Sequence, residues 1–179
     1  MNPTVICFAG RIGSGKSSVS RSFAERAHWK YVSFGDYVRS VARERGSDAE
    51  DRSVLQALGA ALIEVHGWQT FCEKVVSHSG WSGNESLVVD GIRHIEAYTA
   101  LQKLVAPRRT ALAYLDIQES LLRERRLQRQ LPDLGSLAET HSTEIQVIQS
   151  LPGLADILID ADRPVEEIVA DIVTSLGLN

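Results

Sequence analysis

The stretch "FAGRIGSGKSS" at residues 8–18 joins an apolar run to a helical pattern through a turn that contains three glycines. Its letters from Gly10 to Ser17 fit the pattern G-x-x-x-x-G-K-[S/T]. Glycines let the backbone curl so that successive N–H groups point inward, which makes an anion-binding nest at the start of a helix. In such a loop Lys16 reaches the outer phosphates of a nucleotide, and the Ser17 hydroxyl binds Mg²⁺. The sequence therefore predicts a binding site for a nucleoside triphosphate.

The cofactors that follow from this loop are ATP and Mg²⁺. An unliganded flexible turn is the alternative, and it would leave the placement of the motif between a strand and a helix as a coincidence. The residues that we expect to bind the nucleotide are Gly10, Ile12, Gly13, Ser14, Gly15, Lys16, Ser17 and Ser18.

Composition places the chain among ordinary globular proteins. It has 179 residues, of which 44% are hydrophobic and 23% charged, and its formal net charge is −4. A chain of this charge does not attract polyanions as a whole, so a nucleic-acid partner is not expected. Cys7 and Cys72 are far apart and lack the spacing of a metal or redox motif. No stretch approaches the ~18 apolar residues of a membrane span. We therefore expect a cytoplasmic protein without a membrane partner, and we leave its oligomeric state open.

Five apolar runs rich in β-branched residues alternate with amphipathic helical patterns. Near-continuous apolar runs are typical of parallel strands that are buried on both faces. The pattern predicts an α/β fold: a three-layer α/β/α sandwich with a five-stranded parallel sheet in the order 2-3-1-4-5, as in P-loop NTPases. We expect one domain over residues 1–179. The expected strands are 4–9, 30–34, 86–90, 110–116 and 156–160, and the expected helices are 15–27, 35–45, 50–65, 68–79, 94–105, 118–130, 140–150 and 164–176.

Two further segments carry charged residues at positions where a ligand is expected. "FGDYVR" at residues 34–39 opens a helix, and "VVDGIR" at residues 88–93 ends a buried strand on Asp90. Ligands of an open parallel sheet sit beyond the carboxyl ends of its strands. Asp90 and Arg93 therefore converge on the glycine loop if the first and third strands are neighbours.

These motifs resemble those of the nucleoside-monophosphate kinases. That family carries a P-loop, then a "TGD-x-x-R" segment, then "DGFPR" after a third strand, and this chain has "FGDYVR" and "DGIR" at comparable intervals. The chain also looks like the dephospho-coenzyme A kinases and small deoxynucleotide kinases of the same superfamily. The resemblance covers roughly residues 3–130 and is specific for the superfamily rather than for a substrate. Phe34 departs from it, because a threonine is common at that position.

The resemblance implies roles for four residues. Arg39 and Arg93 would bind the phosphate of the acceptor, as guanidinium groups pair bidentately with phosphate oxygens. Asp36 would lie at the acceptor site, where it could orient a hydroxyl acceptor, and Asp90 would help Ser17 to bind Mg²⁺. The structural alternatives are a helix N-cap for Asp36, a strand-end cap for Asp90 and solvated surface positions for the two arginines.

An arginine-rich helix, "LLRERRLQRQ" at residues 121–130, leads into the polar segment that follows it. The i, i+3 spacing places Arg123, Arg126 and Arg129 on one side of the helix. By the resemblance, residues 123–142 form a lid whose arginines, Arg129 together with Arg126 or Arg125, stabilise charge on the transferring phosphoryl group. A surface helix with internal salt bridges is an equal alternative. The sequence departs from the family here, because residues 130–162 contain neither lysine nor arginine.

The function that we expect is ATP- and Mg²⁺-dependent transfer of a γ-phosphoryl group to a small phosphorylated, nucleotide-like acceptor. Residues 35–80 would cover that acceptor, with Trp68 and Phe71 either stacking on it or packing in the core. The depleted lid motivates the alternative, a regulatory ATPase or switch with weak kinase activity or none. The expected catalytic residues are Lys16, Asp36, Arg93, Arg126 and Arg129.

Overall fold

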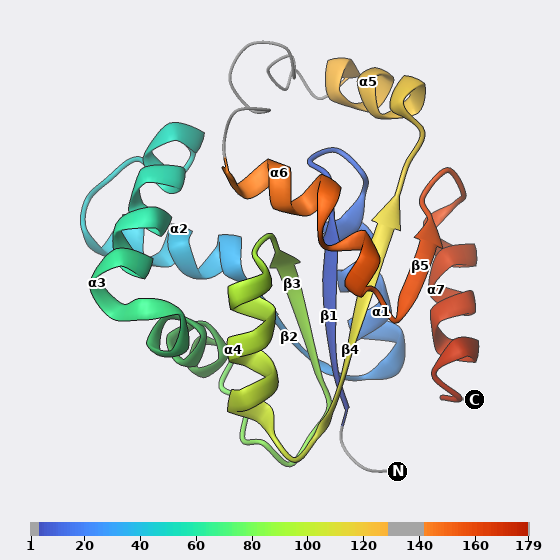
Figure 1. Ribbon diagram of the computed structural model, residues 1–179, viewed down its shortest axis with the longest axis horizontal. Coiled ribbons are helices and arrows are strands. Elements are labelled where there is room, and N and C mark those ends of the chain that lie inside the picture. The colour runs from blue at the N-terminus through green and yellow to red at the C-terminus, as the bar shows by residue number, and fades with distance from the viewer. Residues whose placement is uncertain (1–3, 129–141, 179) are drawn as a thin grey trace.

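The computed structural model describes residues 4–128 and 142–178. Its sheet is parallel throughout and has the strand order β2-β3-β1-β4-β5, so the predicted order is confirmed (Figure 1). The strands are β1 (Thr4–Gly10), β2 (Lys30–Ser33), β3 (Leu87–Ile92), β4 (Arg109–Asp116) and β5 (Ile157–Asp160). Because all strands run the same way, their carboxyl ends meet at one edge of the sheet, and the segments that follow them form the site.

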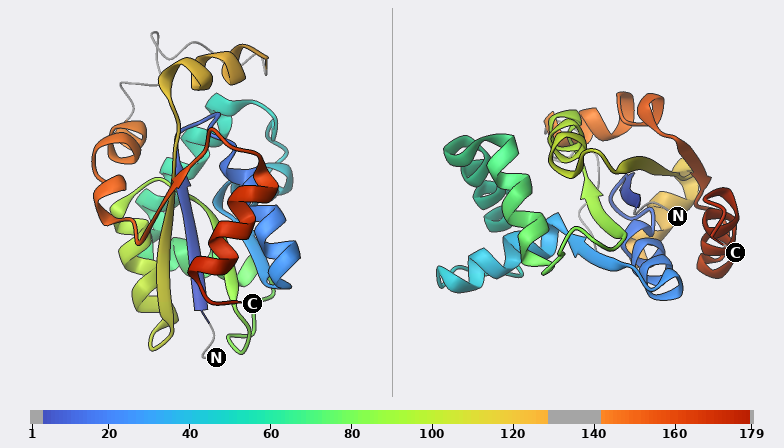
Figure 2. Two further views of the ribbon diagram at one scale, coloured as in Figure 1. Left: turned by 90° about the vertical axis from the view of Figure 1, so that its right-hand side faces the viewer. Right: turned by 90° about the horizontal axis from the view of Figure 1, so that it is seen from below.

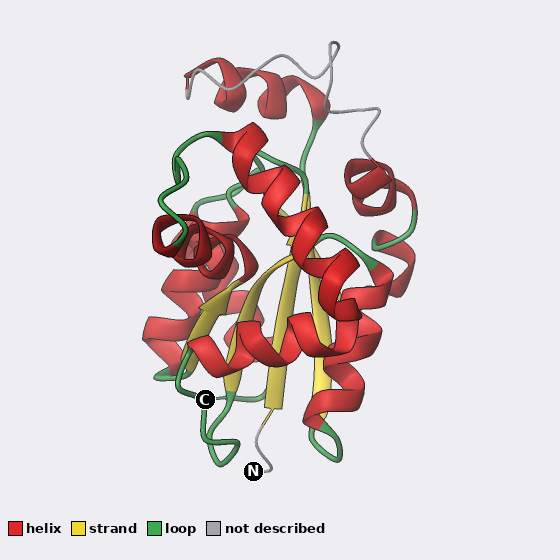
Figure 3. Ribbon diagram, turned by 90° about the vertical axis from the view of Figure 1, so that its left-hand side faces the viewer, coloured by secondary structure: helices red, strands yellow, loops and turns green. Residues whose placement is uncertain are grey.

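Helices cover both faces of the sheet, as the views in Figures 2 and 3 show. Along β1, Val5 and Cys7 belong to one buried cluster, and Ile6 and Phe8 belong to the other. This division explains why β1 reads as a continuous apolar run rather than an alternating one. The first cluster takes in α2 (Phe34–Glu44), α3 (Arg52–His78), α4 (Ile95–Val105) and α6 (Ser142–Gln149), and the second takes in α1 (Lys16–Ala27), α5 (Glu119–Gln128) and α7 (Val165–Ser175).

The helix α3 contains a break at Gly67. The φ and ψ angles of Gly67 are 73° and 164°, a backbone conformation that residues other than glycine rarely adopt. The two helices expected over 50–65 and 68–79 are therefore confirmed as the two helical parts of α3, which meet at Gly67. A short 3₁₀ turn, η1 (Pro152–Leu154), precedes β5.

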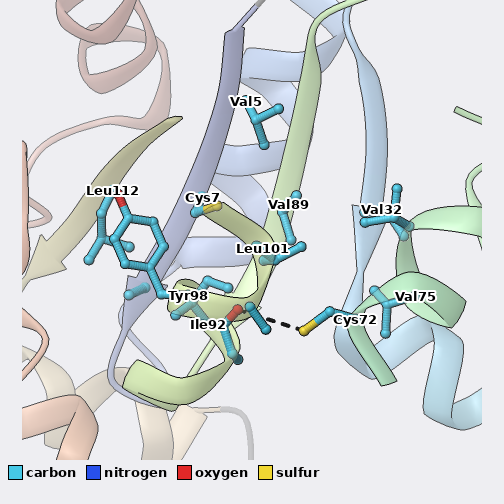
Figure 4. Packing of buried hydrophobic residues seen from close by; sticks show 14 of the residues in the cluster. Val5, Cys7, Val32, Cys72, Val75, Val89, Ile92, Tyr98, Leu101 and Leu112 are labelled. Atoms are coloured by element: carbon cyan, nitrogen blue, oxygen red, sulfur yellow. Dashed lines mark hydrogen bonds between the residues drawn. The ribbon is translucent and has the colours of Figure 1, made fainter. Parts of the chain in front are cut away.

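The core beneath the site is apolar, and both of its cysteines are free and buried. Figure 4 shows Cys72 with its Sγ atom directed at a carbonyl oxygen, that of Ala97, at 3.6 Å. Burial raises the pKa of the Cys72 thiol to about 12, so the group stays protonated at neutral pH. Within the described residues, no helix has the length and apolar character that crossing a membrane requires.

Candidate active site

The glycine loop lies between β1 and α1, where the motif predicted it. Gly13 and Gly15 have φ angles of 95° and 87°, and Gly15 is the N-cap of α1. A Cβ atom on Gly13 would lie 3.0 Å from Cγ of Arg126, so this position has little room for a side chain as well as an unusual backbone. The loop is closed internally by a hydrogen bond from the backbone N–H of Ser14 to the carbonyl of Arg11 (3.1 Å).

Asp90 joins the loop from the end of β3. The ammonium group of Lys16 lies 2.7 Å from Oδ1 of Asp90, and the hydroxyl of Ser17 donates to Oδ2, also over 2.7 Å. The Lys16 and Asp90 side chains are only 9% and 3% exposed. Burial alone raises the pKa of Asp90, but the charge of Lys16 and the hydrogen bonds that Asp90 accepts outweigh it, so its pKa lies below the usual value. A strand-end cap is thus not the role of Asp90.

Ser17 and Asp90 fit a magnesium ion by their chemistry. Their side-chain oxygens are in contact, and oxygen ligands are those that Mg²⁺ prefers in proteins. The structure brings both predicted ligands together, and their role as metal ligands stays a prediction.

Arg93 lies on the same small cavity as the loop. The cavity measures about 150 Å³, and Arg93 is the one lining residue that comes from outside the loop and the first turn of α1. The other lining residues are Arg11, Ile12, Gly13, Gly15, Lys16, Ser17 and Ser18. The chain thus places a guanidinium group beside the phosphate-binding loop, as the position of Arg93 after β3 predicted.

Asp36 and Arg39 lie at the start of α2. The N-cap of this helix is Ser33, whose hydroxyl accepts a hydrogen bond from the backbone N–H of Asp36 (3.3 Å). The N-cap alternative for Asp36 is therefore wrong, and its carboxylate is available for other contacts. Its Oδ1 accepts from Arg39 (3.0 Å) and its Oδ2 accepts from Arg21 (2.5 Å). These three side chains are between 39% and 52% exposed, so they form an accessible ion-pair cluster.

Sequence reasoning missed Arg21 and Tyr31. The Arg21 guanidinium lies over the Tyr31 ring, 4.5 Å from its centroid, and the Tyr31 hydroxyl donates to Oδ2 of Asp90 over 3.1 Å. The contact depends on the register of β2 and β3, in which Tyr31 pairs with Val88, two residues before Asp90 on the same face of the sheet. No local sequence pattern fixes that register. Arg21 and Tyr31 also line a cavity of about 420 Å³ between α1 and β2. The other lining residues are Ala24, Glu25, His28 and Trp29.

The arginines of α5 differ in their contacts: one forms a salt bridge on the helix surface, and two contact the glycine loop. Arg123 is exposed and pairs with Glu119 one turn earlier (3.4 Å), as in a salt-bridged surface helix. Arg125 donates to the carbonyls of Ser14 (3.2 Å) and Ala161 (3.0 Å).

Arg126 is 4% exposed and donates to the carbonyl of Ile12 (3.3 Å). Thus α5, which lies over the carboxyl ends of the strands in Figure 1, holds the backbone of the glycine loop. Arg129 and most of the expected lid lie outside the described residues.

A family model described as an AAA domain, AAA_17, matches residues 9–144. Among curated proteins, a "UPF0200 protein" from Hyperthermus butylicus is 33% identical over 100 residues, which are 56% of this chain and 53% of that protein. A cytidylate kinase from Haloarcula marismortui is 45% identical over 42 residues, 24% of this chain and 22% of that protein. The chain thus spans about half the length of the first of these relatives and less of the second.

Solved structures show the same fold over nearly the whole chain. A gluconokinase from Sinorhizobium meliloti has a TM-score of 0.62 at 22% identity, covering 98% of this chain and 93% of its own. A shikimate kinase from Aquifex aeolicus has a TM-score of 0.59 at 17% identity, covering 97% and 96%. These likenesses concern the fold, a five-stranded parallel sheet with flanking helices that is found in P-loop kinases. Since the family model covers most of the sequence, from β1 to α6, the chain belongs to the AAA domain family.

Proposed function

We propose that the protein is an ATP- and Mg²⁺-dependent kinase that transfers the γ-phosphoryl group to a small nucleotide-like acceptor. The acceptor would be a nucleoside or deoxynucleoside monophosphate, or a molecule like dephospho-coenzyme A. The observation that carries this proposal is the shared cavity of Arg93 and the glycine loop. A nucleotide-binding loop alone needs no arginine from the segment after β3, whereas a phosphorylated acceptor next to the γ-phosphate would use one.

Each group in the site has a role in such a transfer. The loop amides and Lys16 bind the β- and γ-phosphates, and Arg39 and Arg93 bind the acceptor. Ser17 and Asp90 would hold Mg²⁺, which neutralises charge on the phosphate oxygens when bound. Catalysis then consists of positioning two anionic substrates and stabilising charge, with no covalent nucleophile on the protein.

Asp36 has two possible tasks that depend on the acceptor. Its carboxylate orients the Arg39 guanidinium at 3.0 Å, which suits a phosphate acceptor. A hydroxyl acceptor would in addition need a base, and Asp36 is the exposed carboxylate of the α2 cluster.

The second candidate function is a regulatory ATPase or nucleotide-dependent switch. The observation in its favour is that Arg125 and Arg126 donate to backbone carbonyls of the loop and of Ala161. Guanidinium groups engaged in this way hold the loop together and are not directed at a transferring phosphoryl group. With no lysine or arginine in residues 130–162, this chain has fewer cations for that task than its resemblance implies.

The test is phosphoryl transfer from ATP with Mg²⁺ to a panel of acceptors. The panel contains CMP and the other nucleoside and deoxynucleoside monophosphates, dephospho-coenzyme A, and gluconate and shikimate as acids without a nucleotide. We expect product with one nucleotide-like acceptor and none in Lys16→Ala. Arg39→Ala should raise the KM for that acceptor at least about tenfold, the loss of a charge-assisted contact.

The matched control is Arg43→Ala. Arg43 lies one turn further along α2, is 63% exposed and pairs with Glu50 at 3.3 Å, so its removal should leave the acceptor KM unchanged. ATP hydrolysis that needs no acceptor and is unaffected by Arg39→Ala and Arg93→Ala would contradict the kinase and favour the ATPase.

A further inference from the structure

A chain of contacts runs from the nucleotide side of the site to the acceptor side. It begins at Asp90, whose Oδ2 accepts from the hydroxyls of both Ser17 (2.7 Å) and Tyr31 (3.1 Å). The Tyr31 ring lies under the Arg21 guanidinium at 4.5 Å, and Arg21 reaches Asp36 at 2.5 Å. Asp36 in turn holds Arg39. Neither Tyr31 nor Arg21 belongs to the motifs that define the site.

The Tyr31 hydroxyl is suited to hold the Asp90 carboxylate in place when magnesium binds. A magnesium ion would bind a lone pair of the Ser17 oxygen, so the Ser17 O–H could still donate to Oδ2 of Asp90. Tyr31 is the second donor to that oxygen, at 3.1 Å, and a phenol carries its proton at neutral pH. It therefore fixes the orientation of the carboxylate without adding charge to the site.

Arg21 responds to the acceptor side in the same way. Each oxygen of Asp36 pairs with a different arginine, Oδ1 with Arg39 and Oδ2 with Arg21. If an anionic ligand draws Arg39 away from Asp36, Arg21 becomes the one remaining ion-pair partner of that carboxylate among its two arginines, and the Arg21–Asp36 pair becomes stronger. The stronger pair then holds the Arg21 guanidinium in place over the Tyr31 ring, where its charge is attracted by the face of the ring.

We propose that Tyr31 and Arg21 are positioning residues that couple the two halves of the site, so that an anion at Arg39 strengthens binding of the magnesium–nucleotide complex at Asp90. By linkage, the magnesium–nucleotide complex strengthens acceptor binding by the same factor. The identity of the acceptor rests on the proposed function, but the contacts that carry the coupling do not.

The first experiment measures ADP binding by calorimetry, with Mg²⁺ and with EDTA. Tyr31→Phe keeps the ring beneath Arg21 and removes only the hydroxyl. We expect it to weaken ADP binding about two- to tenfold with Mg²⁺, the size of one ordinary hydrogen bond because the lost contact acts only through Asp90, and to leave binding in EDTA unchanged. A merely structural role would lower both affinities together, and that result or no change at all would overturn the proposal.

The second experiment is a double-mutant cycle between the ends of the chain of contacts. Asp36→Asn, Tyr31→Phe and the double variant are compared by their affinity for ADP with Mg²⁺. Coupling predicts that the double variant differs by at least about threefold from the product of the single effects. Additive effects would overturn the coupling, whether or not any acceptor is phosphorylated, because no step of this measurement uses phosphoryl transfer.

Arg21 supplies an independent variant in case Tyr31→Phe is unstable. Arg21→Gln removes the charge from a side chain that is 52% exposed, so the fold should tolerate it. We expect a magnesium-dependent loss like that of Tyr31→Phe. Arg21→Lys should restore it only in part, because lysine lacks the planar group that stacks on the ring.

The control is Arg26→Gln, an exposed arginine near the end of the same helix. It should leave ADP binding unchanged under both conditions. Equal losses in Arg21→Gln and Arg26→Gln would show a general charge effect and overturn the role of Arg21.

Discussion

The two carboxylates of the site, Asp90 and Asp36, both form ion pairs but lie in opposite surroundings. Asp90 is 3% exposed and lies against Lys16, which is 9% exposed. Asp36 is 39% exposed, and its two arginines are 40% and 52% exposed. Removing one partner of a buried pair leaves a charge that water cannot solvate, whereas an exposed pair exchanges its partner for water at little cost.

This difference in exposure gives the two sides of the site different properties when a ligand binds. The Lys16–Asp90 pair stays assembled unless a charged ligand replaces one partner, so the nucleotide side keeps its geometry when it is empty. The arginines around Asp36 can leave it for an incoming anion without a large desolvation cost. Under the proposed function, a rigid nucleotide side and an exchangeable acceptor side would suit a kinase for a small charged acceptor.

The largest expected effect comes from removing the buried carboxylate. Asp90→Ala leaves the Lys16 ammonium buried without its partner, so the free energy of unfolding should fall by about 3–5 kcal/mol. Asp36→Ala breaks two exposed ion pairs and should lower it by less than about 1 kcal/mol. Urea unfolding of both variants, without nucleotide, measures the difference.

The Arg163–Asp171 pair provides the reference for an ordinary surface contact. It joins groups at 2.7 Å whose side chains are 36% and 61% exposed. Asp171→Ala should therefore lower the free energy of unfolding by about as little as Asp36→Ala does. If Asp90→Ala also fell in that range, the contrast between the two sides of the site would be unfounded.

A smaller effect should follow from the arginine that joins the loop to the end of β5. Arg125→Ala removes donors to the carbonyls of Ser14 and Ala161 together. A less ordered loop should bind ATP about tenfold more weakly, because the loop must be ordered anew on binding. Titration with ATP and Mg²⁺ measures this. Arg123→Ala is the control on the same helix. An equal loss of ATP affinity in that variant would show that the contacts of Arg125 with the loop do not contribute to ATP binding.

Local patterns in the sequence were sufficient for the fold and for the glycine loop. The strand order followed from apolar runs and chain connectivity, and Gly67 marked the break within α3. The loop motif could be recognised because the residues that define it lie within eight consecutive positions, Gly10 to Ser17. Asp90 and Arg93 could be placed because one lies near the carboxyl end of a buried strand and the other directly follows that strand, where parallel topology fixes their position.

Contacts between distant elements could not be predicted in the same way. Tyr31 reaches Asp90 only because β2 and β3 pair in one particular register, and a shift by one residue would turn it to the other face. The start of α2 is a related case, since Ser33 rather than Asp36 caps the helix. For α5, helical spacing grouped Arg123 with Arg126, but packing against the loop selected Arg125 and Arg126.

The smallest expected effect concerns His94, which is half-buried beside Arg93 and so lies between the two extremes of exposure. Its ring lies 4.8 Å from that of Trp68, measured between centroids. Burial lowers the pKa of His94 and the charge of Arg93 lowers it further, while Glu96 opposes them. The unfolded chain therefore binds a proton more readily than the folded protein does. The resulting stability is full above about pH 6.5 and is lost as the pH falls through the folded pKa.

Unfolding in urea between pH 7.5 and 5.0 measures this contribution. We expect His94→Gln to have a flatter pH dependence than the wild type, and a single proton sets an upper limit of about 1.4 kcal/mol per pH unit on the difference in slope. His66→Gln, an exposed histidine on α3, is the control and should keep the wild-type slope. Equal slopes in all three proteins would contradict this prediction. They would mean that water solvates the His94 ring in the folded protein, so that His94 belongs with Asp36 on the exposed side of the site.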